Sequence, residues 1–224
     1  MRPNALEFVK IISEVHNFGP VVEFGSLILP GHQDLRGFFP KRKYIGCDIE
    51  KGDGVDRIDD CTKSKFAKGK VGTLIMCETL EHVDKIWLAF KEAKRMLHKN
   101  GLFLVTMPFI FPIHYIPDYW RLTPQALDNF LSIFPHRMVF FQGKYNLPHT
   151  LFGIASNLNI VMGRTSKHLY DNLGRVPGSE DGEMIYQWGG PKEFIHQWTK
   201  EVVEEDQWYS EITGIRGKAV KKLR

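Results

Sequence analysis

Acidic side chains stand in or at the ends of short apolar runs in this sequence. Glu23 lies within the first such run, Val21–Phe24, Asp48 closes the next run, Asp60 closes the third region, and Glu78 directly follows a fourth apolar stretch. In open sheets of parallel strands, ligands bind at the carboxyl ends of the strands. If these runs are neighbouring strands, the four carboxylates converge on one edge of a sheet and predict a ligand site there.

The spacing of two of these acids points to an adenosyl ligand. An acidic residue that closes the second strand, about 20 residues after a glycine turn, is placed to accept hydrogen bonds from both hydroxyls of a ribose. Asp48 stands 23 residues after Gly25, which fits this role. Asp60, at the end of the third strand region, is placed to accept a hydrogen bond from an adenine amino group. Together the two residues predict an adenosyl pocket.

The loop after the first run argues against a dinucleotide. Binding of a pyrophosphate calls for a G-x-G-x-x-G pattern at a helix N-terminus. After Gly25 the chain has Leu27 where the second glycine would stand, then Pro30, and Glu23 would turn its charge toward the phosphates. A nicotinamide dinucleotide is therefore disfavoured, and a ligand with a cationic amino-acid end suits Glu23 better.

An alternation of strands and helices is needed to position these residues. Apolar residues at helical spacing predict helices over residues 5–16 and 83–97, and Thr123 followed by Pro124 predicts the cap and first position of another helix. Short apolar runs predict buried strands over residues 21–24, 43–47, 72–77, 102–107 and 138–141. This order is typical of βαβ units. The predicted fold class is α/β, a three-layer sandwich with a mostly parallel sheet and helices on both faces.

The alternation fades after residue 144, where stretches containing glycine and proline follow. We therefore predict a core over residues 1–144 and a C-terminal extension over residues 145–224, acting as a lid or as a substrate or oligomer contact. The extension has a helical pattern near residues 191–205 and a basic end. It has no linker clear enough to make it a separate domain.

Composition and charge exclude several classes of protein. No apolar run reaches the ~20 residues that a membrane-spanning helix needs, and the N-terminus does not have the pattern of a signal peptide, so we predict a cytoplasmic protein without a membrane partner. The three cysteines lack CxxC spacing and predict buried thiols; we predict neither a disulfide framework nor a metal site. The net charge of +4 is mild, so a nucleic-acid partner stays open without being favoured, as does a homo-oligomer.

Five strings of the sequence together resemble the class I S-adenosylmethionine-dependent methyltransferases of the broad small-molecule type. They are VVEFGS from residue 21, YIGCDIEKGDGVD from residue 44, LIMCETLEHV from residue 74, AKRMLHKNGLFLVTMPF from residue 93 and PIHYIPDYWRLTP from residue 112. The resemblance covers residues 20–135 and implies a Rossmann-like domain that uses S-adenosylmethionine. It departs from the family pattern at Leu27, where a second glycine is usual.

The resemblance also implies which residues contact the cofactor. The methionine part would lie against the first and fourth strands, and the ribose and adenine against the second and third. The residues concerned are Glu23, Gly25, Ser26, Cys77 and Glu78 for the methionine part, and Asp48, Ile49, Asp60 and Cys61 for the nucleoside.

The segment after the fifth strand, residues 108–121, would overhang the reacting methyl group. Methyl transfer chiefly requires alignment of the acceptor and exclusion of water, with a general base only where the acceptor must lose a proton. His114 is the first candidate for that base and Asp118 the second. The residues predicted to contact the acceptor are His82, Tyr115, Tyr119 and Arg121.

Structural roles compete with several of these assignments. Glu81, like Glu78, has a second interpretation as a helix cap, because acidic side chains complement a helix dipole. His82 can also be interpreted as a structural hydrogen-bonding partner, and Tyr119 as a residue that packs the loop onto the core. Arg121 can also be interpreted as the ion-pair partner of Asp118.

Transfer of a methyl group to oxygen or nitrogen of a small molecule is the leading functional hypothesis. A methyltransferase-like module without catalysis is the first alternative, because Leu27 departs from the family pattern. An enzyme directed at RNA through the basic C-terminal end is the second. Methylation of DNA bases is disfavoured, because CETL stands where a motif that grips a flipped base would be expected.

Overall fold

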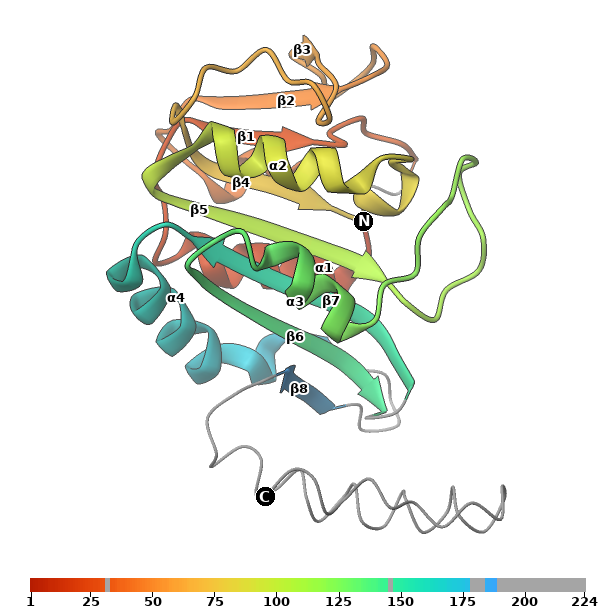
Figure 1. Ribbon diagram of the computed structural model, residues 1–224, viewed down its shortest axis with the longest axis vertical. Helices are drawn as coiled ribbons and strands as arrows, with labels where there is room; N and C mark the ends of the chain where they lie inside the picture. The colour runs from red at the N-terminus through yellow and green to blue at the C-terminus, as the bar shows by residue number, and fades with distance from the viewer. Residues whose placement is uncertain (31–32, 145–146, 178–183, 189–224) are drawn as a thin grey trace, which may run out of the picture. The chain divides into compact units, whose positions relative to one another are not determined.

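A computed structural model of the chain describes residues 1–30, 33–144, 147–177 and 184–188. Figure 1 shows these residues arranged as one sheet with helices on both faces. In chain order the elements are α1 (Pro3–Ser13), β1 (Val21–Phe24), η1 (Leu35–Phe38), β2 (Tyr44–Asp48), β3 (Arg57–Ile58), β4 (Val71–Cys77), η2 (Leu80–His82), α2 (Ile86–Met96), β5 (Leu97–Pro108), α3 (Pro124–Leu131), β6 (His136–Lys144), β7 (Leu147–Ser156), α4 (Asn159–Asn172), η3 (Leu173–Arg175) and β8 (Met184–Trp188).

The strands lie in the order β3-β2-β1-β4-β5-β7-β6-β8. Strands β3, β2, β1, β4 and β5 pair in parallel, so their carboxyl ends share one edge of the sheet. β7 is antiparallel to both β5 and β6, and β8 is antiparallel to β6. The strand order reverses between β1 and β4, and a crevice at such a reversal is where open α/β sheets bind ligands. The predicted mostly parallel α/β sandwich is confirmed.

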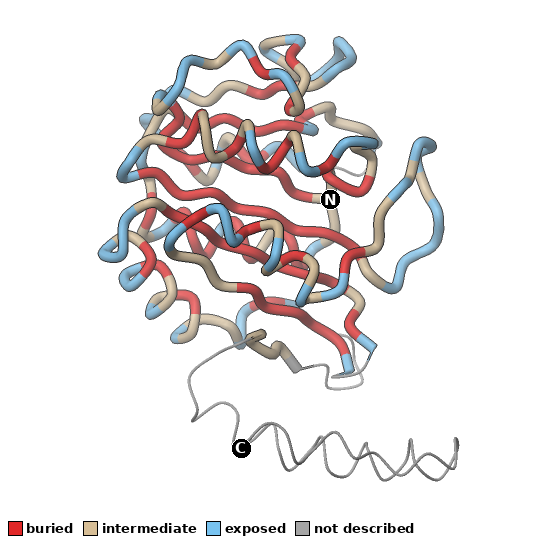
Figure 2. The backbone as a smooth tube through the Cα atoms, viewed as in Figure 1, coloured by how far each residue is buried: buried red, intermediate tan, exposed pale blue. Residues whose placement is uncertain are grey.

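Two apolar layers cover the two faces of the sheet. On one face, α2 and α3 pack Phe90 and Leu127 against the sheet. On the other face, α1 and α4 pack Phe8 and Leu169. All seven residues of β4 are buried, so the central strand lacks a polar face, as expected where helices cover both sides (Figure 2).

Local sequence signals account for several of the helix ends. The Thr123 side chain caps α3 by accepting a hydrogen bond from the backbone N–H of Ala126 at 3.2 Å, and Pro124 follows at the first helical position. This confirms the predicted cap, since proline needs no donor there. α2 begins at Ile86, three residues later than predicted, and its N-cap residue Lys85 makes no side-chain cap bond. Glu81 therefore does not cap α2.

The predicted boundary at residue 144 is wrong. Leu147–Ser156 forms β7, which lies inside the sheet between β5 and β6, and the compact unit extends from residue 1 to residue 188. Pro148 suggests a break in the sequence, and the run from Leu151 to Ala155 is buried on both faces, so it lacks the alternation that marks a half-exposed strand. The predicted role of the remaining extension, and the helical pattern near residues 191–205, lie outside the described residues.

Candidate active site

A glycine turn joins the carboxyl ends of β1, β2 and β4. Gly25 has φ of +80°, and a Cβ at this position would lie 2.3 Å from Oγ1 of Thr79, directly after β4. The backbone N–H groups of Gly25 and Ser26 donate to the carbonyl of Cys47 at 3.0 and 3.2 Å. A side chain at residue 25 is excluded both by the backbone conformation and by the close approach of Thr79.

The carboxylate of Asp48 lies against this turn. Its Oδ2 accepts a hydrogen bond from the backbone N–H of Leu27 at 3.3 Å, and its Oδ1 accepts one from Glu50 at 3.1 Å. Leu27, which replaces the usual second glycine, turns its side chain toward Gly52, where a Cβ would lie 2.4 Å from the leucine Cδ1. The departure at Leu27 is thus accommodated by a glycine in the next loop. Ile49, beside Asp48, is 70% exposed.

Asp60 and its neighbour Asp59 have different surroundings. Asp59 is buried, is paired with Arg57 at 3.2 Å, and bonds the backbone N–H of Lys65. Asp60 is less buried, and its Oδ1 accepts hydrogen bonds from the backbone and side chain of Thr62 at 2.8 and 2.7 Å. Cys61, next in the chain, is buried. Asp59 therefore holds the loop, while Asp60 stands at its surface.

Glu23 is a buried carboxyl in β1, 7% exposed. The hydroxyl of Tyr44 donates to its Oε2 at 2.7 Å. Burial raises the pKa of Glu23 to about 7, and the bond from Tyr44 opposes part of that shift. The sequence did not indicate Tyr44 as a partner, because the two residues are brought together only by the pairing of β1 with β2.

Glu78, directly after β4, is held by the N-terminal segment. Arg2 binds it through two hydrogen bonds, from Nε to Oε2 at 2.8 Å and from Nη2 to Oε1 at 2.6 Å. The same guanidinium lies 5.1 Å from the ring centre of Phe111 and donates to the carbonyl of His149 at 3.2 Å. No signal in the sequence pointed to Arg2, which is 76 residues away from Glu78. Cys77, predicted beside the methionine part, is buried at the end of β4.

The segment 108–121, which we call the β5 loop, is fastened to η2. The backbone N–H of Tyr119 donates to the carbonyl of Glu81 at 2.7 Å, and the indole N–H of Trp120 donates to the carbonyl of Val83 at 2.8 Å. His82 Nδ1 lies 2.8 Å from the carbonyl oxygen of Pro117. This contact agrees with the interpretation of His82 as a structural hydrogen-bonding partner.

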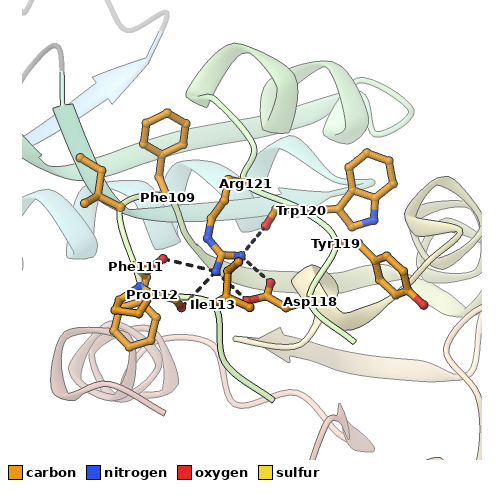
Figure 3. A pocket seen from close by; sticks show the side chains of 9 residues that line it. Phe109, Phe111, Pro112, Ile113, Asp118, Tyr119, Trp120 and Arg121 are labelled. Carbon is orange, nitrogen blue, oxygen red and sulfur yellow. Dashed lines mark hydrogen bonds and ion pairs between the residues drawn. The ribbon is translucent and has the colours of Figure 1, made fainter. Parts of the chain in front are cut away.

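Asp118 is occupied by partners within the β5 loop. Its Oδ1 and Oδ2 accept hydrogen bonds from Arg121 at 2.5 and 2.7 Å (Figure 3). Oδ2 also accepts a hydrogen bond from the backbone N–H of His114 at 3.0 Å. The Arg121 bonds hold the pKa of this carboxyl well below its usual range. Its side chain is 1% exposed. A carboxylate so stabilised in its charged form is a weak proton acceptor, which argues against the predicted role of Asp118 as a base.

A pocket of about 610 Å³ lies along the β5 loop. Figure 3 shows the ion pair of Asp118 and Arg121 among apolar and aromatic side chains. The lining residues are Phe109, Ile110, Phe111, Pro112, Ile113, Asp118, Tyr119, Trp120 and Arg121. Tyr115 and Tyr119, both predicted to contact the acceptor, are 58% and 51% exposed.

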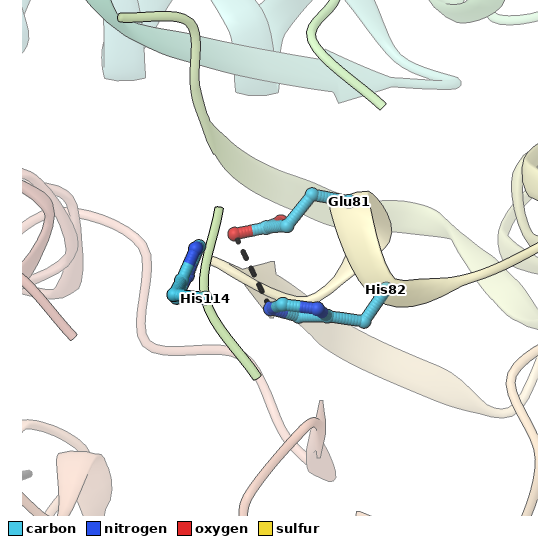
Figure 4. Close-up of side chains that lie close together, drawn as sticks. All are labelled: Glu81, His82 and His114. Atoms are coloured by element: carbon cyan, nitrogen blue, oxygen red, sulfur yellow. Dashed lines mark ion pairs between the residues drawn. The ribbon is translucent and has the colours of Figure 1, made fainter. Parts of the chain in front are cut away.

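One carboxylate and two imidazoles meet where η2 contacts the β5 loop. Figure 4 shows the side chains of Glu81 and His82 from η2 directed toward the region of His114 from the loop. Their ligand atoms all lie within 4.8 Å of one another, and Nε2 of His82 is 3.9 Å from Oε1 of Glu81. No sequence pattern indicates this cluster, because its members come from two segments that only the loop contacts bring together.

Comparison with known proteins matches part of the chain to a family model. Residues 41–105, which run from the segment before β2 into β5, match the family model described as a methyltransferase domain. No curated protein matches the sequence. Within the described residues, no helix is long and apolar enough to cross a membrane.

Solved structures share the fold at low sequence identity. A Thermotoga maritima protein described as a S-adenosylmethionine-dependent methyltransferase and possible histamine N-methyltransferase is 15% identical, with a TM-score of 0.51 over 69% of this chain and 89% of that one. The YcgJ protein of Bacillus subtilis is 11% identical, with a TM-score of 0.52 over 70% of this chain and 100% of that one. A S-adenosylmethionine-dependent methyltransferase from Archaeoglobus fulgidus is 13% identical, with a TM-score of 0.50 over 67% and 93% of the two chains.

The likeness to these structures shows the fold, and the family match spans Asp48, Asp60 and Glu78. The chain therefore matches a methyltransferase domain over residues 41–105 and has the fold of solved S-adenosylmethionine-dependent methyltransferases.

Proposed function

We propose that this enzyme transfers a methyl group to an oxygen or nitrogen atom of a small-molecule acceptor that has an apolar part. The observation that carries the proposal is the pocket of about 610 Å³ along the β5 loop, lined mostly by apolar and aromatic side chains. Its volume is in the range that small-molecule sites occupy, and its one ion pair offers a polar group that can orient a ligand. The loop follows β5, at the same sheet edge as the cofactor residues.

The residues at the ends of β1 and β2 fit the cofactor. The carboxylate of Asp48 is the proposed partner of the ribose hydroxyls, and the exposed side chain of Ile49 is the proposed apolar surface beside the adenine. The buried hydroxyl of Ser26 accepts or donates no hydrogen bond within the described part of the chain, so it is a polar atom that a ligand can satisfy. These three observations support binding of an adenosyl group at this turn.

Two further contacts are proposed for the nucleoside and methionine ends. Asp60 and the backbone of Cys61 are the proposed contacts of the adenine edge. Glu23, Cys77 and Glu78 are the proposed neighbours of the methionine part, where Arg2 holds Glu78 in position. When bound, the cofactor supplies an electrophilic methyl group; the chain's own residues align the acceptor and exclude water.

On the acceptor side we propose contacts from His82, Tyr115, Tyr119 and Arg121. Asp118 holds Arg121 and the backbone of His114 in place, so its proposed role is to position the loop. His114 stays the proposed proton acceptor where the acceptor must lose a proton. The alternative of a module without catalysis receives no support from the described residues, because Gly52 accommodates Leu27. The alternative of an RNA-directed enzyme depends on the basic C-terminal end, which lies outside the described residues.

Calorimetric titration tests the proposal in two stages. Binding of S-adenosylmethionine and S-adenosylhomocysteine with micromolar affinity, without binding of NAD, is expected for the cofactor site. Formation of S-adenosylhomocysteine is then measured against a panel of hydroxyl and amine acceptors with aromatic or aliphatic parts. Turnover confined to small polar acceptors, or to RNA, would show that the apolar pocket does not select the substrate.

A further inference from the structure

Glu81 presents a buried carboxylate without a bonding partner. Its exposed fraction is 0%, and neither of its oxygens accepts a hydrogen bond from another residue that the structure describes. Burial raises the pKa of Glu81 to about 8, and the nearby charge of Glu78 adds to that shift. An ionised carboxylate is strongly disfavoured in such surroundings unless a cation compensates it. Burying the ionised carboxylate therefore costs folding free energy, and a bound cation would offset that cost.

Two imidazoles lie close to this carboxylate. Nδ1 of His82 lies 2.8 Å from the carbonyl oxygen of Pro117. Because a carbonyl oxygen can only accept, Nδ1 carries a proton, and the lone pair of the neutral ring is on Nε2, 3.9 Å from Oε1 of Glu81. Nδ1 of His114 lies 3.2 Å from the carbonyl oxygen of Pro112 and 3.3 Å from Oδ2 of Asp118, so the lone pair of its neutral ring is likewise on Nε2.

This hydrogen bonding is the arrangement found around metal-binding histidines. Such residues donate the proton of the second ring nitrogen to a carbonyl or carboxylate, which sets the tautomer and the orientation of the ring. His82 has a carbonyl partner, and His114 has a carbonyl and a carboxylate partner. The partners thus prepare both rings to act as neutral ligands.

We propose that Glu81, His82 and His114 bind one divalent transition-metal ion of the zinc type. Two imidazoles and a carboxylate form a donor set used by catalytic zinc sites, and imidazole favours such ions over Mg²⁺. Ligand atoms of one tetrahedral zinc lie roughly 3.4 Å apart, given bond lengths of about 2.1 Å. The present atoms lie within 4.8 Å of one another, so the ligand atoms need to approach by up to about 1.4 Å on binding.

The ion would stand on the acceptor side of the site, because His114 belongs to the loop that lines the pocket. Ligation uses the lone pair that a general base needs. Metal binding therefore replaces the role of proton acceptor proposed above for His114, and it does not depend on the identity of the methyl acceptor.

Calorimetric titration of the metal-stripped full chain with zinc chloride tests the site. We expect one ion per chain with micromolar or tighter affinity, and weaker binding of Mg²⁺. Glu81→Gln and His82→Ala should each lower zinc affinity at least about tenfold. His136→Ala is the matched control, a histidine at the start of β6 away from the cluster, and should leave zinc affinity unchanged.

Thermal unfolding of the same variants separates loss of the site from loss of the fold. Without metal, Glu81→Gln should melt no lower than the natural chain, because it removes a buried ionisable group and keeps the shape. Zinc should raise the melting temperature of the natural chain and of His136→Ala but not that of Glu81→Gln. Absence of zinc binding at millimolar concentration, equal binding by Glu81→Gln, or tighter binding of Mg²⁺ would each overturn the proposal.

Discussion

The ends of β1, β2 and β3 and the β5 loop lie at the same edge of the sheet, but different contacts hold them. At the strand ends, most of the hydrogen bonds are donated by backbone groups. The N–H groups of Gly25 and Ser26 donate to the carbonyl of Cys47, and that of Leu27 donates to the carboxylate of Asp48. The β5 loop is held largely by side chains, through the pair of Asp118 and Arg121 and the bonds of His82 and Trp120 to carbonyls.

The strand ends and the β5 loop should therefore tolerate amino-acid substitutions differently. Backbone contacts at strand ends follow from the sheet itself, so many residue types keep them and only the turn glycine is irreplaceable. Side-chain contacts in a loop can be exchanged one at a time without disturbing the sheet. We therefore expect cofactor binding to be general to this architecture and acceptor binding to be set by the particular residues of the β5 loop.

Gly25→Ala should have the largest effect of these substitutions on cofactor binding. The added Cβ meets Thr79 and forces a side chain into φ of +80°, so we expect affinity for S-adenosylhomocysteine to fall more than about 100-fold and stability to fall by about 2–4 kcal/mol. Calorimetry and urea unfolding measure the two effects. Gly37→Ala is the control, since a Cβ there meets no heavy atom within 4 Å. Cofactor affinity within a few-fold of the natural chain would show that the turn adapts.

Asp48→Ala should weaken cofactor binding by about 1–3 kcal/mol, the loss of charge-assisted hydrogen bonds to the ribose. Its effect is smaller than that of Gly25→Ala because the turn itself persists. Titration with S-adenosylhomocysteine measures it, with Asp171→Ala, an exposed aspartate on α4, as control. Undiminished affinity in Asp48→Ala would overturn the assignment of Asp48 to the ribose.

Asp118→Asn should affect the β5 loop and leave the strand ends intact. It removes the charge that pairs with Arg121, and we expect a stability loss of about 2 kcal/mol, below the value for fully buried pairs because Arg121 is partly exposed. Proteolysis within residues 109–119 should accelerate, while cofactor affinity stays within about twofold.

The control for this variant is Asp128→Asn, which breaks a similar aspartate–arginine pair between α3 and β6. A fall in cofactor affinity in Asp118→Asn that the control does not share would show that the strand ends and the β5 loop are coupled.

Glu23→Gln should change the pH dependence of stability. Burial raises the folded-state pKa of Glu23 to about 7 from 4.5, so its contribution to stability is fully present below pH 4.5 and is lost as the pH rises through 7. The variant should lack this loss and gain about 1–3 kcal/mol relative to the natural chain between pH 5 and pH 8. Urea unfolding across that range measures it; parallel curves for the two proteins would contradict the burial argument.

The meeting of Asp48 with the turn at Gly25 could be predicted because its signals are local. Asp48 and Gly25 stand at strand ends that apolar runs mark in the sequence, and parallel pairing brings such ends together. The β5 loop was located correctly, yet the choice between a catalytic and a structural Asp118 depended on whether Arg121 turned toward it.

The α/β class, the strands β1, β2, β4 and β5, the cap of α3 and the edge at which the acidic residues gather could all be predicted from the amino-acid sequence, because each follows from short-range spacing and burial. Long-range contacts in the folded chain were needed to show that β7 enters the sheet between β5 and β6, that Arg2 holds Glu78, and that Glu81, His82 and His114 meet. Those contacts join segments far apart in the chain, and no local pattern specifies which distant partner a buried strand or carboxylate will find.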